Sequence, residues 1–177
     1  MPSESDLGRI PVQLIEMDQD YCGNTYGVGP CTANQANKCY QGFSNCQDKD
    51  NFDQQSITLR FPKPQTDLPE DEYIIPSLRS VSTSSTMLNI GGRSSDTKAL
   101  GKRASVSIVV QDHPHGDNFV DPYVSERTYE PLKNGTFWGK WLKRNPFYTG
   151  RNLRVLNGYY GQTLAEMQTQ HYVIDSI

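Results

Sequence analysis

The sequence predicts a mainly β protein. Six to eight short segments combine apolar and β-branched residues with two-residue alternation, and clusters of Gly, Pro, Asn or Asp separate them. Only residues 163–170 have a composition that suits a helical turn or two. Short strands at this spacing are typical of an all-β sandwich or barrel. The sequence contains no internal repeat.

The expected strands begin close to the N-terminus, after polar residues 1–9. Pro11 marks the start of the first strand, in which Val12, Leu14 and Glu16 share one side. The clearest alternation is the run ASVSIVVQ at 104–111. In chain order, the expected strands are 10–18, 56–61, 73–81, 87–90, 104–111, 137–143, 152–160 and 172–177.

Composition and charge exclude several classes of protein. The 177 residues carry 17 basic and 20 acidic side chains, a net charge of −3, which is not the basic surface of a dedicated nucleic-acid binder. No apolar run is long enough to cross a bilayer, and the acidic N-terminus does not resemble a signal peptide. We therefore expect an intracellular product with no membrane span. The usual phosphate-loop, dinucleotide, serine-hydrolase and zinc-protease motifs are absent, so we expect no enzymatic activity.

The most informative feature is the clustering of the cysteines. All four, Cys22, Cys31, Cys39 and Cys46, fall in a segment rich in Gly, Asn and Gln that has almost no aliphatic residues. Such a segment cannot bury a core of its own. It needs a covalent or metal-based link between its parts.

Three kinds of link compete for these cysteines. Two disulfides have three possible pairings but do not suit a reducing compartment. Zinc modules usually present thiolates in pairs two to four residues apart, whereas the smallest gap here is six. Wide gaps suit an iron–sulfur cluster better, and neighbouring glycines would let backbone amides approach sulfur. Spacing therefore favours a cluster and leaves zinc, disulfides and four unrelated free thiols open, although the clustering argues against the last of these. The aromatic residues expected to shield a cluster are Tyr21, Tyr26, Tyr40 and Phe43.

Three other features could carry chemistry. The run DHPHGD at 112–117 could bind a metal, but we favour a turn in which Asp112 and Asp117 accept backbone amide hydrogen bonds. His171 is expected to be a partly buried side chain on a strand. The aromatic and basic stretch 135–146 holds both tryptophans and is interpreted as core or interface rather than a single-stranded nucleic-acid site.

The cysteine segment resembles the cysteine module of lambda-type minor tail proteins, the tail-tip hub proteins of long-tailed bacteriophages related to tail tip protein L. The resemblance rests on Tyr21-Cys22, Gly27-Val28-Gly29-Pro30-Cys31, Cys39, Cys46 and Asn51-Phe52. The outer gaps of eight and six residues are the same, whereas the middle gap is shorter and the module precedes the β-domain. The downstream blocks that resemble hub β-domain sequence are 100–106, 112–115, 135–141 and 144–146.

The resemblance implies a structural protein of the virion. In that family four cysteines hold a [4Fe-4S] cluster, which would make Cys22, Cys31, Cys39 and Cys46 the ligands. It further implies a hub-type β-barrel or sandwich, a homotrimer at the tail tip assembled in the host cytoplasm, and contacts with the distal tail or tube protein and the central fibre protein. The rival interpretations are a small iron–sulfur electron-transfer protein and a zinc- or disulfide-stapled binding module.

The expected organisation has three parts. Residues 1–19 form a lead and a short strand, 20–53 form the cysteine-rich loop module, and 54–177 form the β-rich hub domain. Because the strand-like end 172–177 has no polar tail, we expect the chain to continue beyond Ile177.

Overall fold

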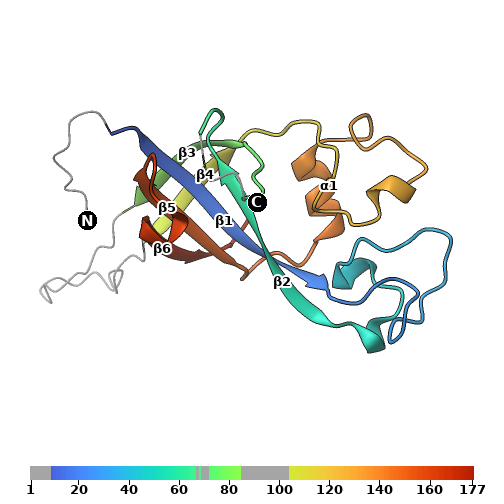
Figure 1. Cartoon of the computed structure of the whole chain (residues 1–177). Coiled ribbons are helices and arrows are strands. Elements are labelled where there is room, and N and C mark those ends of the chain that lie inside the picture. The colour runs from blue at the N-terminus through green and yellow to red at the C-terminus, as the bar shows by residue number, and fades with distance from the viewer. Residues whose placement is uncertain (1–8, 67, 69–71, 85–103) are drawn as a thin grey trace, which may run out of the picture.

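The computed structural model describes residues 9–66, 68, 72–84 and 104–177, and these form two antiparallel sheets with one α-helix (Figure 1). The predicted mainly β class is confirmed. The expected strand at 87–90 lies outside the described residues. The strands are β1 Pro11–Cys22, β2 Gln54–Pro62, β3 Leu78–Ser84, β4 Ser105–Val110, β5 Asn152–Tyr159 and β6 Gln168–Val173, and the helix is α1 Phe137–Arg144.

The larger sheet has the strand order β2-β1-β5-β6, so β1 is central and pairs with both β2 and β5. Its alternation sends Val12 and Leu14 to one face and Ile15 and Met17 to the other, and all four are buried. The strand is longer than expected and ends at Cys22.

One face of this sheet packs against the β3-β4 sheet and α1. The cluster of side chains between them forms the main core, and a smaller cluster covers the opposite face of β1 and β5. On that opposite face, Glu16 binds Arg60 at 2.9 Å and Arg154 at 2.8 Å across three neighbouring strands. The main core consists of Ile15, Met17, Leu59, Phe61, Ile75, Leu78, Phe137, Trp138, Trp141, Val155 and Ile174.

The strand expected at 137–143 is wrong, because this segment is helix α1. Phe137, Trp138 and Trp141 lie on one side of the helix and are buried, which is the spacing of a helical rather than an alternating pattern. The Asp112 carboxylate accepts a hydrogen bond from the Trp138 amide at 2.9 Å and satisfies a free donor of the first turn. The basic residues Lys143 and Arg144 occupy the last turn, where they are favourable. The prediction that the tryptophans belong to the core is confirmed.

Three further elements differ from their expected bounds. The third strand begins only at Leu78, after Pro76, while Ile74 forms an isolated bridge with Arg60. Within 163–170 only Leu164–Glu166 forms a 3₁₀ turn, and β6 begins at Gln168.

Among the residues that the structure describes, no helix is long and apolar enough to cross a membrane.

Candidate functional site

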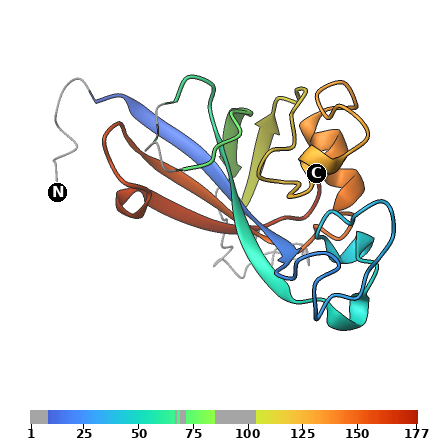
Figure 2. The same cartoon turned by 45° about the vertical axis from the view of Figure 1, so that its right-hand side comes forward.

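The cysteine segment is an insertion between two neighbouring strands. The chain leaves the sheet at Cys22 and returns at Gln54, and these two residues are paired in the β1-β2 ladder. Residues 23–53, which we call the cysteine module, contain only two 3₁₀ turns, Phe43–Asn45 and Lys49–Asn51. No aliphatic side chain of this fully described segment is buried. The module lies beside the part of the chain that holds α1 (Figures 1 and 2).

Polar side chains tie the module together from inside. The Asp48 carboxylate accepts hydrogen bonds from the Thr32 amide at 2.7 Å and from its hydroxyl at 2.9 Å. These bonds, with others from Asn51, lower the pKa of Asp48. The Tyr26 hydroxyl accepts from the Gln35 amide at 2.7 Å and binds Gln47. Such bonds hold separate turns together where apolar contacts are lacking.

The four thiols are free; Cys22 ends β1, and the other three lie in the module. Cys22 is buried and the other three are half-buried. Burial raises the pKa of the Cys39 thiol, and the proximity of Cys46, Cys31 and Cys22 raises it further. Burial likewise raises the pKa of the Cys46 thiol, and the charges of Cys22 and Cys31 raise it further. Each of these two thiols is therefore close enough to the others for their charges to interact.

Two backbone amides point at sulfur. The Asp48 amide donates to Cys46 Sγ at 3.4 Å, and the Gln41 amide donates to Cys39. Gln41 adopts a left-handed φ of 54°, which is unusual for a residue other than glycine. Amide donors directed at thiolate sulfur are the interactions that adjust iron–sulfur clusters.

The cysteines have the ligand chemistry of an iron–sulfur or zinc site, but the structure does not bring them together as one. All four thiols are free, and the backbone amide of Asp48 donates to Cys46 Sγ. Soft thiolate ligands suit iron–sulfur clusters and zinc more than hard cations. Within the described part of the chain, no three His, Cys, Asp or Glu side chains are placed so that they could hold a metal ion.

Arg127 joins the module to the rest of the protein. Its guanidinium donates to the Lys38 carbonyl at 2.6 Å and to the Cys39 carbonyl at 2.9 Å. The same group forms an ion pair with Asp121 at 2.9 Å. The Arg127 side chain is 7% exposed and that of Asp121 is fully buried. One buried arginine thus connects a distant carboxylate to the backbone at a cysteine.

Tyr40 fills the space between two arginines. Its ring centroid lies 4.0 Å from the Arg127 guanidinium carbon and 4.2 Å from that of Arg144, distances typical of cation–π contacts. Its hydroxyl lies 2.9 Å from that of Tyr129. Burial and this hydroxyl contact raise the pKa of Tyr129 to about 12, so the Tyr129 phenol stays neutral at physiological pH. The module therefore docks through aromatic and cationic groups.

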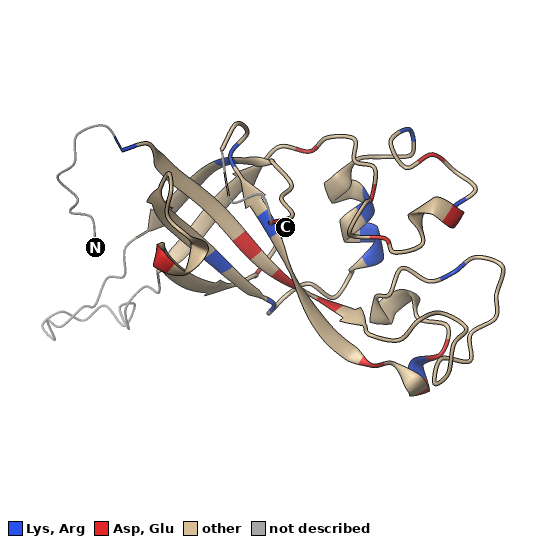
Figure 3. Ribbon diagram, viewed as in Figure 1, with Lys and Arg blue, Asp and Glu red and all other residues tan. Residues whose placement is uncertain are grey.

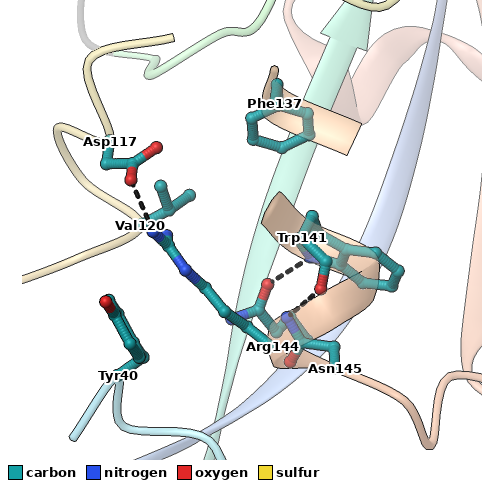
Figure 4. Close-up of a pocket in the computed structure, with 8 residues that line it drawn as sticks. Tyr40, Asp117, Val120, Phe137, Trp141, Arg144 and Asn145 are labelled. Atoms are coloured by element: carbon teal, nitrogen blue, oxygen red, sulfur yellow. Dashed lines mark hydrogen bonds and ion pairs between the residues drawn. The ribbon is translucent and has the colours of Figure 1, made fainter. Parts of the chain in front are cut away.

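Asp117 anchors the surface on which the module rests. Its buried carboxylate binds Lys140 at 2.7 Å and Arg144 at 2.6 Å, both from α1. Figure 4 shows the contact with Arg144. Burial opposes ionisation, but the contacts with His115, Lys140 and Arg144 outweigh it and hold the pKa of Asp117 well below its usual range. The blue segments of α1 in Figure 3 are its three basic residues, Lys140, Lys143 and Arg144. A cavity of about 10 Å³ beside these groups has room for one water.

The turn expected at 112–117 is wrong, because this segment is extended, with an isolated bridge between Pro114 and Thr136, and the turn follows at 118–120. Asp112 accepts the Trp138 amide, as described above, and both ring nitrogens of His115 are engaged, Nδ1 by the Asp117 amide at 3.0 Å and Nε2 by the Tyr73 hydroxyl at 3.1 Å. The expectation for His171 is wrong, since this residue is exposed on β6, an edge strand. Of the aromatic residues expected to shield a cluster, Phe43 is 49% exposed and packs on Phe52 instead.

The groups that hold the module are not evident in the sequence. Arg127 lies 88 positions from Cys39, whose carbonyl it binds, and Asp121 acts on the module only through Arg127 in the contacts described. No spacing rule connects residues so far apart. The signal that could have drawn attention to them is compositional: residues 117–130 have several aromatic and charged residues but few aliphatic ones.

Comparison with known proteins gave no match, since no family model, curated protein or solved structure is significantly similar to the chain.

Proposed function

We propose that this protein is a structural component of a bacteriophage tail tip in which a [4Fe-4S] cluster, bound by Cys22, Cys31, Cys39 and Cys46, stabilises the cysteine module. The observation that supports the cluster is the clustering of all four cysteines between positions 22 and 46, in a segment without a core. The tail-tip role rests on the resemblance of the cysteine segment and its downstream blocks to lambda-type hub proteins.

The cluster has a structural task in this proposal. The module holds no buried aliphatic side chain, so its ordering entropy is opposed by polar contacts and by a few aromatic ones, such as Phe43 on Phe52 and Tyr40 between two arginines. Four metal–thiolate bonds would supply the missing free energy, as metal binding does in other small metal-dependent domains. The protein's own residues arrange the thiols and direct amide donors at two of them. No catalytic activity is proposed.

We also propose the oligomeric state of the protein and its neighbours in the tail tip. The two packed sheets would form a hub-type β-barrel or sandwich within a homotrimer, between the distal tail or tube protein and the central fibre protein. A net charge of −3 suits a subunit beside a DNA-conducting channel, because such a subunit should not retain the DNA that passes it.

Metal analysis tests the cluster directly. After anaerobic purification we expect about four irons and four sulfides per chain, with a broad absorption band near roughly 400 nm. The Cys31→Ser variant should lose most of the iron, whereas Thr25→Ser, a change at an exposed module residue, should keep it. One zinc per chain without sulfide, or two disulfides without metal, would contradict the proposal.

Phage assembly tests the tail-tip role separately. Virions carrying Cys31→Ser should have incomplete or non-infective tails, while Thr25→Ser virions should be normal. If the Cys31→Ser virions infect as well as the wild type, the module has no structural task at the tail tip.

A further inference from the structure

We infer that Arg127 is the positioning residue for the middle of the cysteine module, because it fixes the backbone at Cys39 and thereby the place of that thiol. This inference rests on the proposed cluster and adds a residue outside the cysteine segment to the site. Arg127 touches no sulfur in the contacts described above. It acts through the carbonyl groups of Lys38 and Cys39.

The Arg127 guanidinium binds the Asp121 carboxylate and the module backbone at the same time. On one side Nε donates to Asp121 Oδ2 at 2.9 Å and Nη2 donates to Oδ1 at 3.0 Å. On the other side Nη1 and Nη2 donate to the two successive module carbonyls. A planar group with five donors can make all of these bonds together, whereas an ammonium group cannot.

The anchor behind Arg127 is rigid. Asp121 Oδ1 accepts a further hydrogen bond from the Tyr123 amide at 3.1 Å, and the Asp121 amide donates to the Asp117 carbonyl at 2.9 Å. Asp117 is itself held by Lys140 and Arg144 of α1. The position of Cys39 is thus connected through one arginine to a buried network that ends on a core helix.

Residues 121–127, which hold Arg127 and Asp121, contact the module through two other side chains. The Tyr123 hydroxyl accepts the Tyr26 amide at 2.8 Å, and Glu126 pairs with Lys38 at 2.8 Å. The Glu126 side chain is 54% exposed, so its pair contributes little. Tyr123 is buried like the Arg127 side chain but binds the amide of Tyr26, whereas Arg127 is the one of the three that binds the carbonyl of a cysteine.

The positioning role is tested by comparing the rates at which Arg127→Lys and Arg154→Lys lose iron. Arg154 is also a multiply bonded arginine, but it pairs with Glu16 and Asp18 in the sheet and makes none of the contacts described for the module. We expect Arg127→Lys to lose iron to a chelator at least about tenfold faster than the wild type, and Arg154→Lys to lose it at the wild-type rate. Asp121→Asn, which weakens the anchor without altering the module, should give an intermediate rate.

A metal-free measurement separates this inference from the cluster itself. Trypsin recognises Lys and Arg alike, so both variants keep the wild-type cleavage sites. In metal-free protein, cleavage after Lys38 should be about tenfold faster in Arg127→Lys than in either the wild type or Arg154→Lys. Tryptophan fluorescence checks that the core is intact in each variant.

The outcomes are distinguishable. If the wild type holds iron but Arg127→Lys releases it no faster, the positioning role is wrong and the cluster stands. If the wild type holds no iron, the cluster is wrong and the positioning of a ligand falls with it. In that case faster cleavage after Lys38 would leave Arg127 only a structural contact of the loop.

Discussion

Asp117 illustrates how single buried charges organise this protein. Its carboxylate is 1% exposed yet ionised, because two cations of α1 reach it from one side of the helix. A buried pair of this kind is weak evidence for net stability, but removing one partner leaves the others without compensation. The cost of such a change should therefore be large.

Asp117→Asn tests this at the residue scale. We expect a loss of about 3–5 kcal/mol in the free energy of unfolding at pH 7, measured by urea denaturation. The matched control is Glu130→Gln, whose pair with Lys133 is exposed on both sides and should contribute about 0–1 kcal/mol. Equal effects of the two changes would contradict the importance of burial.

The pH dependence of the same variant has a definite sign. The pKa of Asp117 is lower in the folded protein than its usual value of about 3.9 in the unfolded chain. Its contribution is therefore fully present above about pH 4 and is lost as the pH falls through the folded value. The stability difference between wild type and Asp117→Asn should shrink between about pH 5 and pH 2.

The partners of these charged residues could not have been predicted from the sequence. Asp117 was expected to accept backbone amides in a turn, and in the structure its carboxylate instead pairs with Lys140 and Arg144. The sequence identifies a residue type suited to a turn but not the helix that packs against it. Tertiary contacts therefore decided the role of this side chain.

At the scale of elements, strands were predicted better than the helix. The alternation of 56–61, 104–111 and 152–160 corresponds to β2, β4 and β5 almost residue by residue. Successive residues of a strand point to opposite faces of the sheet. Where the two faces meet different environments, the sequence of the strand therefore alternates with a period of two residues. The buried aromatic residues of α1 have a helical spacing, but aromatic residues are also enriched in strands, and eight residues are too few for the spacing to outweigh that preference.

Gly158 of β5 tests the packing between elements. A Cβ atom there would lie 2.5 Å from Met167 Cγ and 2.8 Å from Gln162 Oε1. We expect Gly158→Ala to cost about 1–3 kcal/mol by overpacking, measured by thermal unfolding. Gly116→Ala is the control, since its nearest neighbour would be 3.7 Å away, and it should change stability by less than about 0.5 kcal/mol. An unchanged melting temperature for Gly158→Ala would show that Met167 and Gln162 move aside freely.

At the scale of the whole molecule, the core and the module are held by different forces. The main core draws on both sheets and α1 but on no residue of 23–53. Composition alone predicted that this segment lacks a core, and its half-buried cysteines agree with that. The sequence did not predict its docking surface, because the surface is made of polar residues far away in the chain.

The variant with Cys31, Cys39 and Cys46 all changed to Ser should therefore retain the core. We expect cooperative thermal unfolding and buried tryptophan fluorescence from Trp138 and Trp141, together with rapid proteolysis of the module. Leu59→Ala, by contrast, changes the main core and should lower the free energy of unfolding by about 2–5 kcal/mol. Exposed tryptophans in the triple variant would mean that the core depends on the module.

The pairing of Cys22 with Gln54 has a consequence for engineering. Opposed residues of antiparallel strands have Cα atoms only about 4.5–5.5 Å apart, a distance that a two-residue Asn-Gly turn can close. The module can therefore be excised as a cassette and β1 joined directly to β2. Transplanting it into another hairpin is harder, because the recipient must also supply an acid-anchored arginine beside the cassette, in the place that Arg127 and Asp121 occupy here.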